Sequence, residues 1–120
     1  MRAQYYFRKP PRGLCAWNVQ GLVERTRDFV RECVPLSAIR ELDELYWGEL
    51  TCRKVVGHAR LMLECDFEFP VILSSDGRVM DGMHRISKAP FEGLSEIEAV
   101  RFVTDPEPDY IGVDPDELPY

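Results

Sequence analysis

A glycine, a histidine and an arginine at positions 82–85 carry the clearest chemical signal in this chain. The run Asp81-Gly82-Met83-His84-Arg85 follows an apolar segment and opens a predicted helix. Gly82 lacks a Cβ, so the backbone can approach a ligand closely there. The free N–H groups at the start of a helix carry a positive partial charge, and His84 and Arg85 add donors at the same place. The pattern predicts a cradle for phosphate groups.

Each charged residue of this segment has two interpretations. The planar guanidinium of Arg85 binds a phosphate through two parallel hydrogen bonds, or it forms a salt bridge with Asp81. Asp81 caps the helix, or it helps to hold a magnesium ion beside the phosphates. His84 donates to a phosphate oxygen, or it bonds to the backbone at the helix start. Lys88, one turn into the helix, reaches a phosphate or lies at the surface.

The segment 43–49 supplies acidic and aromatic side chains for the same site. Glu44 is a candidate general base that would take a proton from an acceptor hydroxyl, and its alternative is a solvated acidic turn. Tyr46 and Trp47 are either anchors of the core or loop, or a platform on which an adenine ring stacks. His58, further along the chain, is expected to be half-buried with its hydrogen bonds satisfied.

A hairpin of two strands must bring the cradle into place. Val71-Ile72-Leu73 predicts a buried strand, Ser75-Asp76-Gly77 a tight turn, and Arg78-Val79-Met80 the returning strand. The helix that carries the cradle should end or kink at Pro90. Alternating apolar and charged residues over 96–103 predict a further strand.

The segments before the hairpin predict helices and one undecided element. Thr51 is the expected N-cap of a helix over 52–65. Residues 36–42 predict a short helix that follows a proline. The stretch 27–35 reads as a strand, but a single helix over 21–33 fits equally well, and the pattern does not decide between them.

The composition is typical of a globular protein with one domain. The 120 residues are 45% hydrophobic and 30% charged, which is enough to bury a core without metals or disulfides. We expect an N-terminal arm over 1–13 that is either loose or an edge segment, a core over 14–103, and an acidic, proline-rich tail over 104–120. The tail is expected to be irregular, and either wrapped over the body or loose. The four cysteines form no CxxC pair, so we expect reduced thiols and a cytoplasmic protein.

Charge and hydropathy argue against two classes of partner. A formal net charge of −6 does not suit a protein that relies on the phosphates of DNA. The apolar runs are too short for a transmembrane helix, so we expect no membrane association. The acidic tail is instead suited to docking on a protein partner.

The run Asp81-Gly82-Met83-His84-Arg85-Ile86-Ser87-Lys88-Ala89 resembles the motif of the ParB/sulfiredoxin superfamily. Members share a hairpin followed by a glycine, often a histidine or arginine, then an arginine, and an alanine about one turn later. The resemblance covers roughly residues 34–103 and implies an α+β fold, with helices packed on a small mixed sheet. Met83 stands where sulfiredoxin has its reactive cysteine, and a thioether forms no thiolate, so we do not expect sulfiredoxin chemistry.

The resemblance also implies a ligand. The motif binds nucleotide phosphates in ParB and ATP phosphates in sulfiredoxin, so ATP or another nucleoside phosphate, with Mg²⁺, is the implied cofactor. The phosphate ligands would be Gly82, Met83, His84 and Arg85, with Lys88 beside them. Some stand-alone members phosphorylate free serine and carry a glutamate after the first helix, a position to which Glu44 corresponds.

The superfamily suggests second-rank candidates as well. Its helix before the hairpin approaches the nucleotide, which brings in Arg53, Lys54 and His58. A full ParB also carries a helix-turn-helix region and a dimerisation domain, and this chain has no counterpart of either, which leaves the nucleotide-binding core in a stand-alone form.

We therefore expect a nucleotide-binding protein that hydrolyses or transfers a phosphate, the acceptor being a small hydroxyl-bearing molecule. Glu44 or Asp81 would supply the carboxylate, and if both faced away from Arg85 the transfer would lack a base. One alternative is a non-catalytic regulatory or protein-interaction module. Another is a ParB-like DNA-associated protein or nuclease, which would need clustered metal-binding carboxylates and a basic groove.

Overall fold

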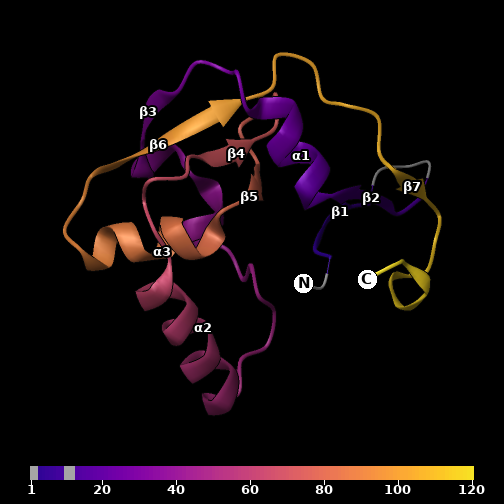
Figure 1. The fold of residues 1–120 in the computed structure, drawn as a ribbon. Coiled ribbons are helices and arrows are strands. Elements are labelled where there is room, and N and C mark those ends of the chain that lie inside the picture. Colours follow the sequence, from indigo (N-terminus) through magenta and orange to yellow (C-terminus); the bar gives the residue numbers. More distant parts are fainter. Residues whose placement is uncertain (1–2, 10–12) are drawn as a thin grey trace.

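The computed structural model describes residues 3–9 and 13–120, which form an α+β fold with two separate sheets (Figure 1). The α+β class predicted from the sequence is confirmed. The predicted small mixed sheet is present, and a second, three-stranded sheet accompanies it.

The larger sheet has the strand order β3-β6-β4-β5. β6 runs antiparallel to β3 and parallel to β4, while β4 and β5 form an antiparallel hairpin. The strands are β3 (Glu32–Pro35), β4 (Val71–Leu73), β5 (Val79–Asp81) and β6 (Glu96–Arg101). The hairpin and the strand after it thus lie where the sequence predicted them, with ends shifted by one or two residues.

The smaller sheet is antiparallel and joins the two ends of the chain. Its order is β1-β2-β7, with β1 (Tyr5–Arg8), β2 (Cys15–Asn18) and β7 (Tyr110–Ile111). The indole N–H of Trp17 donates to the carbonyl of Pro106 at 2.9 Å. The acidic tail is therefore wrapped over the body. The predicted arm lies partly outside the described residues, at 1–2 and 10–12, and its described part supplies the edge strand β1.

The undecided segment contains both a helix and a strand. The helix α1 (Val19–Thr26) is followed by β3, so neither a continuous strand over 27–35 nor a continuous helix over 21–33 forms. The short helix predicted over 36–42 is two 3₁₀ turns, Leu36–Ala38 and Arg40–Asp43. A third 3₁₀ turn, Pro115–Glu117, lies in the tail.

Two further helices flank the hairpin. The helix α2 (Cys52–Glu64) begins as predicted, because the Thr51 hydroxyl accepts a hydrogen bond from the backbone N–H of Lys54. The helix α3 (Met83–Phe91) follows β5 and carries Pro90 in its last turn. α2 packs against α3 and extends from it away from the sheet (Figure 1).

The larger sheet buries apolar side chains on both faces, which anchors the hairpin from both sides. One face, covered by α3, holds Val71 and Val79. The opposite face packs against α1 and β2 and holds Ile72 and Met80. Successive strand residues point to opposite faces, so this alternation follows from the strand geometry. The segment after β5 is therefore held in a fixed place.

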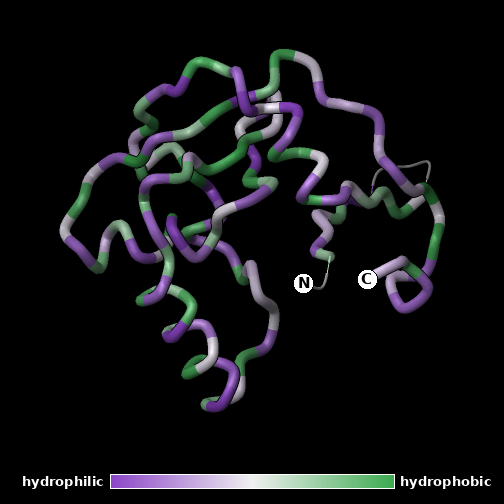
Figure 2. The backbone as a smooth tube through the Cα atoms, viewed as in Figure 1, coloured by the Kyte–Doolittle hydropathy of each residue, from purple (hydrophilic) through white to green (hydrophobic). Residues whose placement is uncertain are grey.

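The outer helix α2 differs from the hairpin, because none of its residues is buried. Apolar and polar residues alternate along it (Figure 2).

The four cysteines of the chain are free thiols. Among the helices of the described ranges, none combines the length and the hydropathy needed to span a membrane.

Candidate functional site

Gly82 joins β5 to α3 and has no room for a side chain. Its φ of +105° lies in the left-handed region, which favours glycine. A Cβ placed there would lie 2.6 Å from Cγ1 of Val71 and 2.8 Å from Nη2 of Arg85. Glycine is therefore required both by the backbone conformation and by the close approach of these two side chains.

The start of α3 offers backbone donors that the helix does not use. The first hydrogen bond of the helix runs from the N–H of Ile86 to the carbonyl of Gly82 at 3.0 Å. The N–H groups of residues 83–85 precede it, and Gly82, the N-cap, has no side chain to accept from them. Asp81 is the last residue of β5, so the prediction that it caps the helix is wrong.

Arg85 is largely buried and only partly hydrogen-bonded. Its side chain is 14% exposed, and Nη2 donates to Oδ2 of Asp81 at 3.1 Å, the salt bridge that the sequence offered as one interpretation. Its Nε is buried and has no hydrogen-bond partner within 3–9 and 13–120. A buried donor without a partner costs free energy, so an anion that accepted from Arg85 would be stabilised there.

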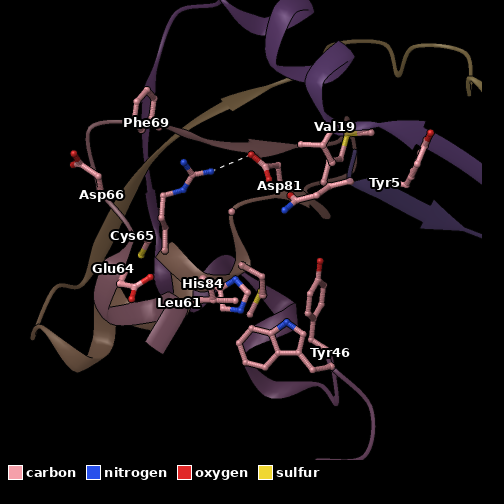
Figure 3. Close-up of a pocket in the computed structure, with 16 residues that line it drawn as sticks. Tyr5, Val19, Tyr46, Leu61, Glu64, Cys65, Asp66, Phe69, Asp81 and His84 are labelled. Atoms are coloured by element: carbon pink, nitrogen blue, oxygen red, sulfur yellow. Dashed lines mark hydrogen bonds and ion pairs between the residues drawn. The ribbon is translucent and has the colours of Figure 1, made fainter. Parts of the chain in front are cut away.

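A cleft of about 620 Å³ opens beside the start of α3. All five residues from Asp81 to Arg85 line it. Figure 3 shows Asp66 and Phe69 on one side of the cleft, Tyr5 and Val19 on the other, and His84 near Tyr46. The volume lies within the range of small-molecule sites.

The two histidines of the chain meet beside the cleft, which His84 lines and His58 does not. Nδ1 of His58 and Nε2 of His84 lie 2.9 Å apart, which is a hydrogen bond between the two rings. The indole of Trp47 stacks on both, with centroid distances of 4.1 Å to His58 and 5.0 Å to His84. His58 is half-buried and satisfied, as predicted, whereas His84 bonds to a side chain and not to the backbone.

The environment keeps two side chains of the cleft uncharged near neutral pH. Burial lowers the pKa of His84, and the neighbouring His58 lowers it further. Burial also raises the pKa of Tyr46, and the negative charge of Glu41 adds to that effect. The Tyr46 hydroxyl therefore stays protonated and available as a donor.

Glu44 lies away from the cleft. Its two carboxylate oxygens accept hydrogen bonds from Nη1 of Arg78 at 2.8 and 3.0 Å, at the turn end of the hairpin. It does not line the cleft, whereas Asp81 does and contacts Arg85. Of the two predicted carboxylates, the structure brings only Asp81 to the cradle.

Lys88 caps the C-terminal end of α2. Its ammonium group donates to the carbonyls of Cys65 and Leu63, at 2.9 and 3.4 Å, beyond and within the last turn of that helix. A cation at a helix C-terminus is favourable for the same reason that an anion is favourable at its start. Lys88 does not line the cleft, and neither do the exposed Arg53 and Lys54.

The sequence did not predict the other residues that line the cleft, and four of these carry polar groups. Gln4 and Tyr5 reach the cleft because β1 pairs with β2, and Glu64 and Asp66 reach it from the end of α2. No local pattern signals such long-range placement. In the part of the chain that the structure describes, no three His, Cys, Asp or Glu residues gather to hold a metal, so the clustered carboxylates of a nuclease are not seen.

Comparisons of the chain with protein-family models, with curated proteins and with solved structures found no match. Function must therefore be inferred from the chemistry of the site.

Proposed function

We propose that this protein binds a nucleoside phosphate, with the phosphates held at the start of α3. One combination of features carries the proposal: an N-cap glycine with no room for a Cβ, an uncapped helix start, and a buried guanidinium whose Nε lacks a partner in the described ranges. The helix start and the guanidinium favour an anion, and the glycine allows Arg85 to lie close to the helix start. The Arg85 fork can bind phosphate at two points.

The cleft has room for the remainder of a nucleotide. Trp47 and Tyr46 line it and present aromatic surface suited to stacking a base. The protonated Tyr46 hydroxyl and the neutral ring of His84 add polar groups that can orient the ligand. An isolated phosphate would leave this aromatic wall unused, which is why we propose a nucleoside phosphate as the ligand.

Asp81 is the carboxylate we assign to the chemistry. Magnesium binds through one or two carboxylates together with phosphate oxygens and water, and Asp81 fits that donor set because it lines the cleft beside Arg85. The ion would offset the charge of the phosphates. We propose hydrolysis or transfer of a phosphate to a small hydroxyl-bearing acceptor as the reaction class, with no role for Glu44 or Lys88.

Calorimetric titration of ATP, ADP, CTP and GTP, each with and without Mg²⁺, tests the proposal. We expect magnesium-dependent binding of at least one nucleotide. Arg85→Ala should weaken it more than tenfold, about 1.4 kcal/mol, with little change in Tm. Arg78→Ala is the control, because Arg78 lies at the far end of the hairpin and does not line the cleft. No binding by the wild type, or unchanged binding by Arg85→Ala, would overturn the proposal.

A second candidate function is a non-catalytic protein-interaction module. Val56 and Leu63 of α2 are 63% and 62% exposed, and Phe91 of α3 is 72% exposed. Exposed apolar side chains on adjacent helices are typical of contact surfaces. Sedimentation of the wild type beside Leu63→Lys and Phe91→Lys tests this candidate. Self-association that both variants abolish, without nucleotide binding, would favour it over the first.

A further inference from the structure

A second pocket, of about 400 Å³, shares Phe69, Asp81 and Arg85 with the cleft, and the rest of its wall comes from residues that do not line the cleft. Its other residues come from α1 and the segment after it, from the segment before β4, and from β4 and β6. Val23, Phe29 and Ile72 give it a largely apolar wall. An apolar enclosure with a few polar groups is the usual composition of a small-molecule site.

The charged residues of this pocket are mostly arginines. Arg27, Arg31 and Arg85 line it, against the single carboxylate of Asp81. This excess of positive charge is local, because the chain as a whole carries a formal net charge of −6. An anion is therefore favoured at this position in a protein that otherwise repels anions.

Two of the three arginines are already paired. Arg85 donates to Asp81 at 3.1 Å. Arg31 donates to the carbonyl of Glu68 at 2.9 Å and to Oε2 of Glu98 at 3.3 Å.

Arg27 is different, because its side chain has no hydrogen bond or ion pair with any residue of 3–9 and 13–120. Arg27 is exposed, so it stands at the mouth of the pocket. The buried Thr26 hydroxyl beside it donates to the carbonyl of Leu22 at 2.9 Å and offers no free donor. The pocket thus has one cation, Arg27, that has no partner in the described ranges and lies beside an apolar wall.

We propose that this pocket binds a small monocarboxylate with an apolar body, either a single aromatic ring or a short aliphatic chain. The carboxylate pairs with Arg27, and the body lies against Val23, Phe29 and Ile72. A single free guanidinium matches one negative charge, whereas a polyphosphate would need several. The site does not depend on nucleotide binding in the cleft, and Arg85, which lines both pockets, lies between the two sites.

Titration of the full chain with phenylacetate and with octanoate, followed by amide chemical shifts in ¹⁵N-labelled protein, tests the proposal. We expect saturable shifts at Val23, Phe29 and Ile72. Phenylacetamide, which has the same body without the charge, should bind at least tenfold more weakly. Arg27→Gln should weaken phenylacetate binding about tenfold, and Val23→Trp should block it by filling the mouth.

Arg25→Gln is the matched control, since Arg25 lies in α1 as an exposed residue but does not line the pocket. It should leave phenylacetate binding unchanged. Both Arg27 and Val23 are exposed, so their variants should fold, which the amide spectrum itself reports. Equal affinity for phenylacetamide and phenylacetate, retained affinity in Arg27→Gln, or no shifts up to about 10 mM of either carboxylate would overturn the proposal.

Discussion

The hairpin of β4 and β5 carries an arginine–carboxylate pair near each end, and the two pairs are used differently. At the turn end, Nη1 of Arg78 donates to both oxygens of Glu44 and lies 3.7 Å from the buried Glu41. At the helix end, Arg85 makes one hydrogen bond, to Asp81, and its buried Nε has no partner among the described residues.

The difference indicates that the turn end of the hairpin stabilises the fold, whereas the helix end is available to a ligand. The groups of the turn end are bonded to one another and tie the hairpin to the 3₁₀ turn at 40–43. The groups of the helix end line a cleft. Some of their hydrogen-bond donors, the N–H groups of residues 83–85 and part of the guanidinium, are not used by the helix or by Asp81. Oε1 of Glu41 is also buried without a hydrogen-bond partner in the described ranges, so what distinguishes the helix end is that its groups line a cleft. Similar residue types thus serve stability where they bond to one another and are open to a ligand where they line a cleft.

Replacing Gly82 by alanine should give the largest effect, a loss of about 3 kcal/mol in the free energy of unfolding. The variant combines a left-handed backbone with a Cβ 2.6 Å from Val71 Cγ1. Urea unfolding measures it. Gly93→Ala is the control, because Gly93 has a φ of +77° but open space around it, and it should cost about 1 kcal/mol. Equal losses would mean that the close contact at Gly82 does not matter.

At the turn end, Glu41→Ala should lower the free energy of unfolding by about 2 kcal/mol. Oε2 of Glu41 accepts from the backbone N–H of Val79 at 2.8 Å, and the variant leaves that buried donor unpaired. Glu44→Ala removes an exposed carboxylate and should cost less. If nucleotide binding fell as strongly as stability in Glu41→Ala, the two ends of the hairpin would not be separable.

At the helix end, Asp81→Asn should change binding more than stability. Removing the negative charge frees Arg85 and reduces repulsion, so binding of ATP without Mg²⁺ should strengthen roughly fivefold, about 1 kcal/mol. The dependence on Mg²⁺ should decrease at the same time. Calorimetry with both forms of the nucleotide measures this, and Glu44→Gln should show no change. An equal gain in affinity for ATP in Glu44→Gln would mean that the effect is not specific to the helix end of the hairpin.

The smallest expected effect is on the pH dependence of stability, because groups at the two ends of the hairpin titrate in different pH ranges. The pKa of His84 is lowered from 6.5 by burial and by His58, so the unfolded chain binds a proton more readily and stability should fall as the pH drops below about 6.5. The pKa of Asp76, at the turn, is lowered from 3.8 mainly by the Ser74 hydroxyl, so its contribution is present above that value and is lost at more acidic pH.

Unfolding at pH 7.5, 6.5 and 5.5 in the wild type and in His84→Gln measures the window of the helix end, because the window of Asp76 lies at more acidic pH. The slope between pH 6.5 and 5.5 should be smaller in the variant, and it cannot exceed about 1.4 kcal/mol per pH unit for one proton. A wild-type stability that rises on acidification through this range would contradict the assignment to His84.

The local parts of the molecule were predictable from the sequence, and the reason is physical. Buried strands, a glycine turn and a Thr51 cap are set by neighbouring residues, so the hairpin and both flanking helices were placed within a few residues. The residues of the cradle, Asp81 to Arg85, lie together for the same reason.

The long-range parts were not predictable. Glu44 pairs with Arg78 across 34 positions, and His58 meets His84 across 26, pairings that only the packed fold decides. Lys88 had the right spacing for a phosphate but bonds to the carbonyls at the end of α2, a partner that no local pattern reveals. The three-stranded sheet depends on a pairing between the two ends of the chain, and only its edge segment at the N-terminus was offered by the sequence.

A titration of ¹⁵N-labelled protein with ATP and Mg²⁺, with amide shifts compared at both ends of the hairpin, is the most direct test of phosphate binding at the start of α3. We expect saturable shifts that are largest at the amides of Gly82, Met83, His84 and Arg85, with little change at Gly77 and Arg78. Saturable shifts centred on the turn end, or none at the start of α3, would contradict it.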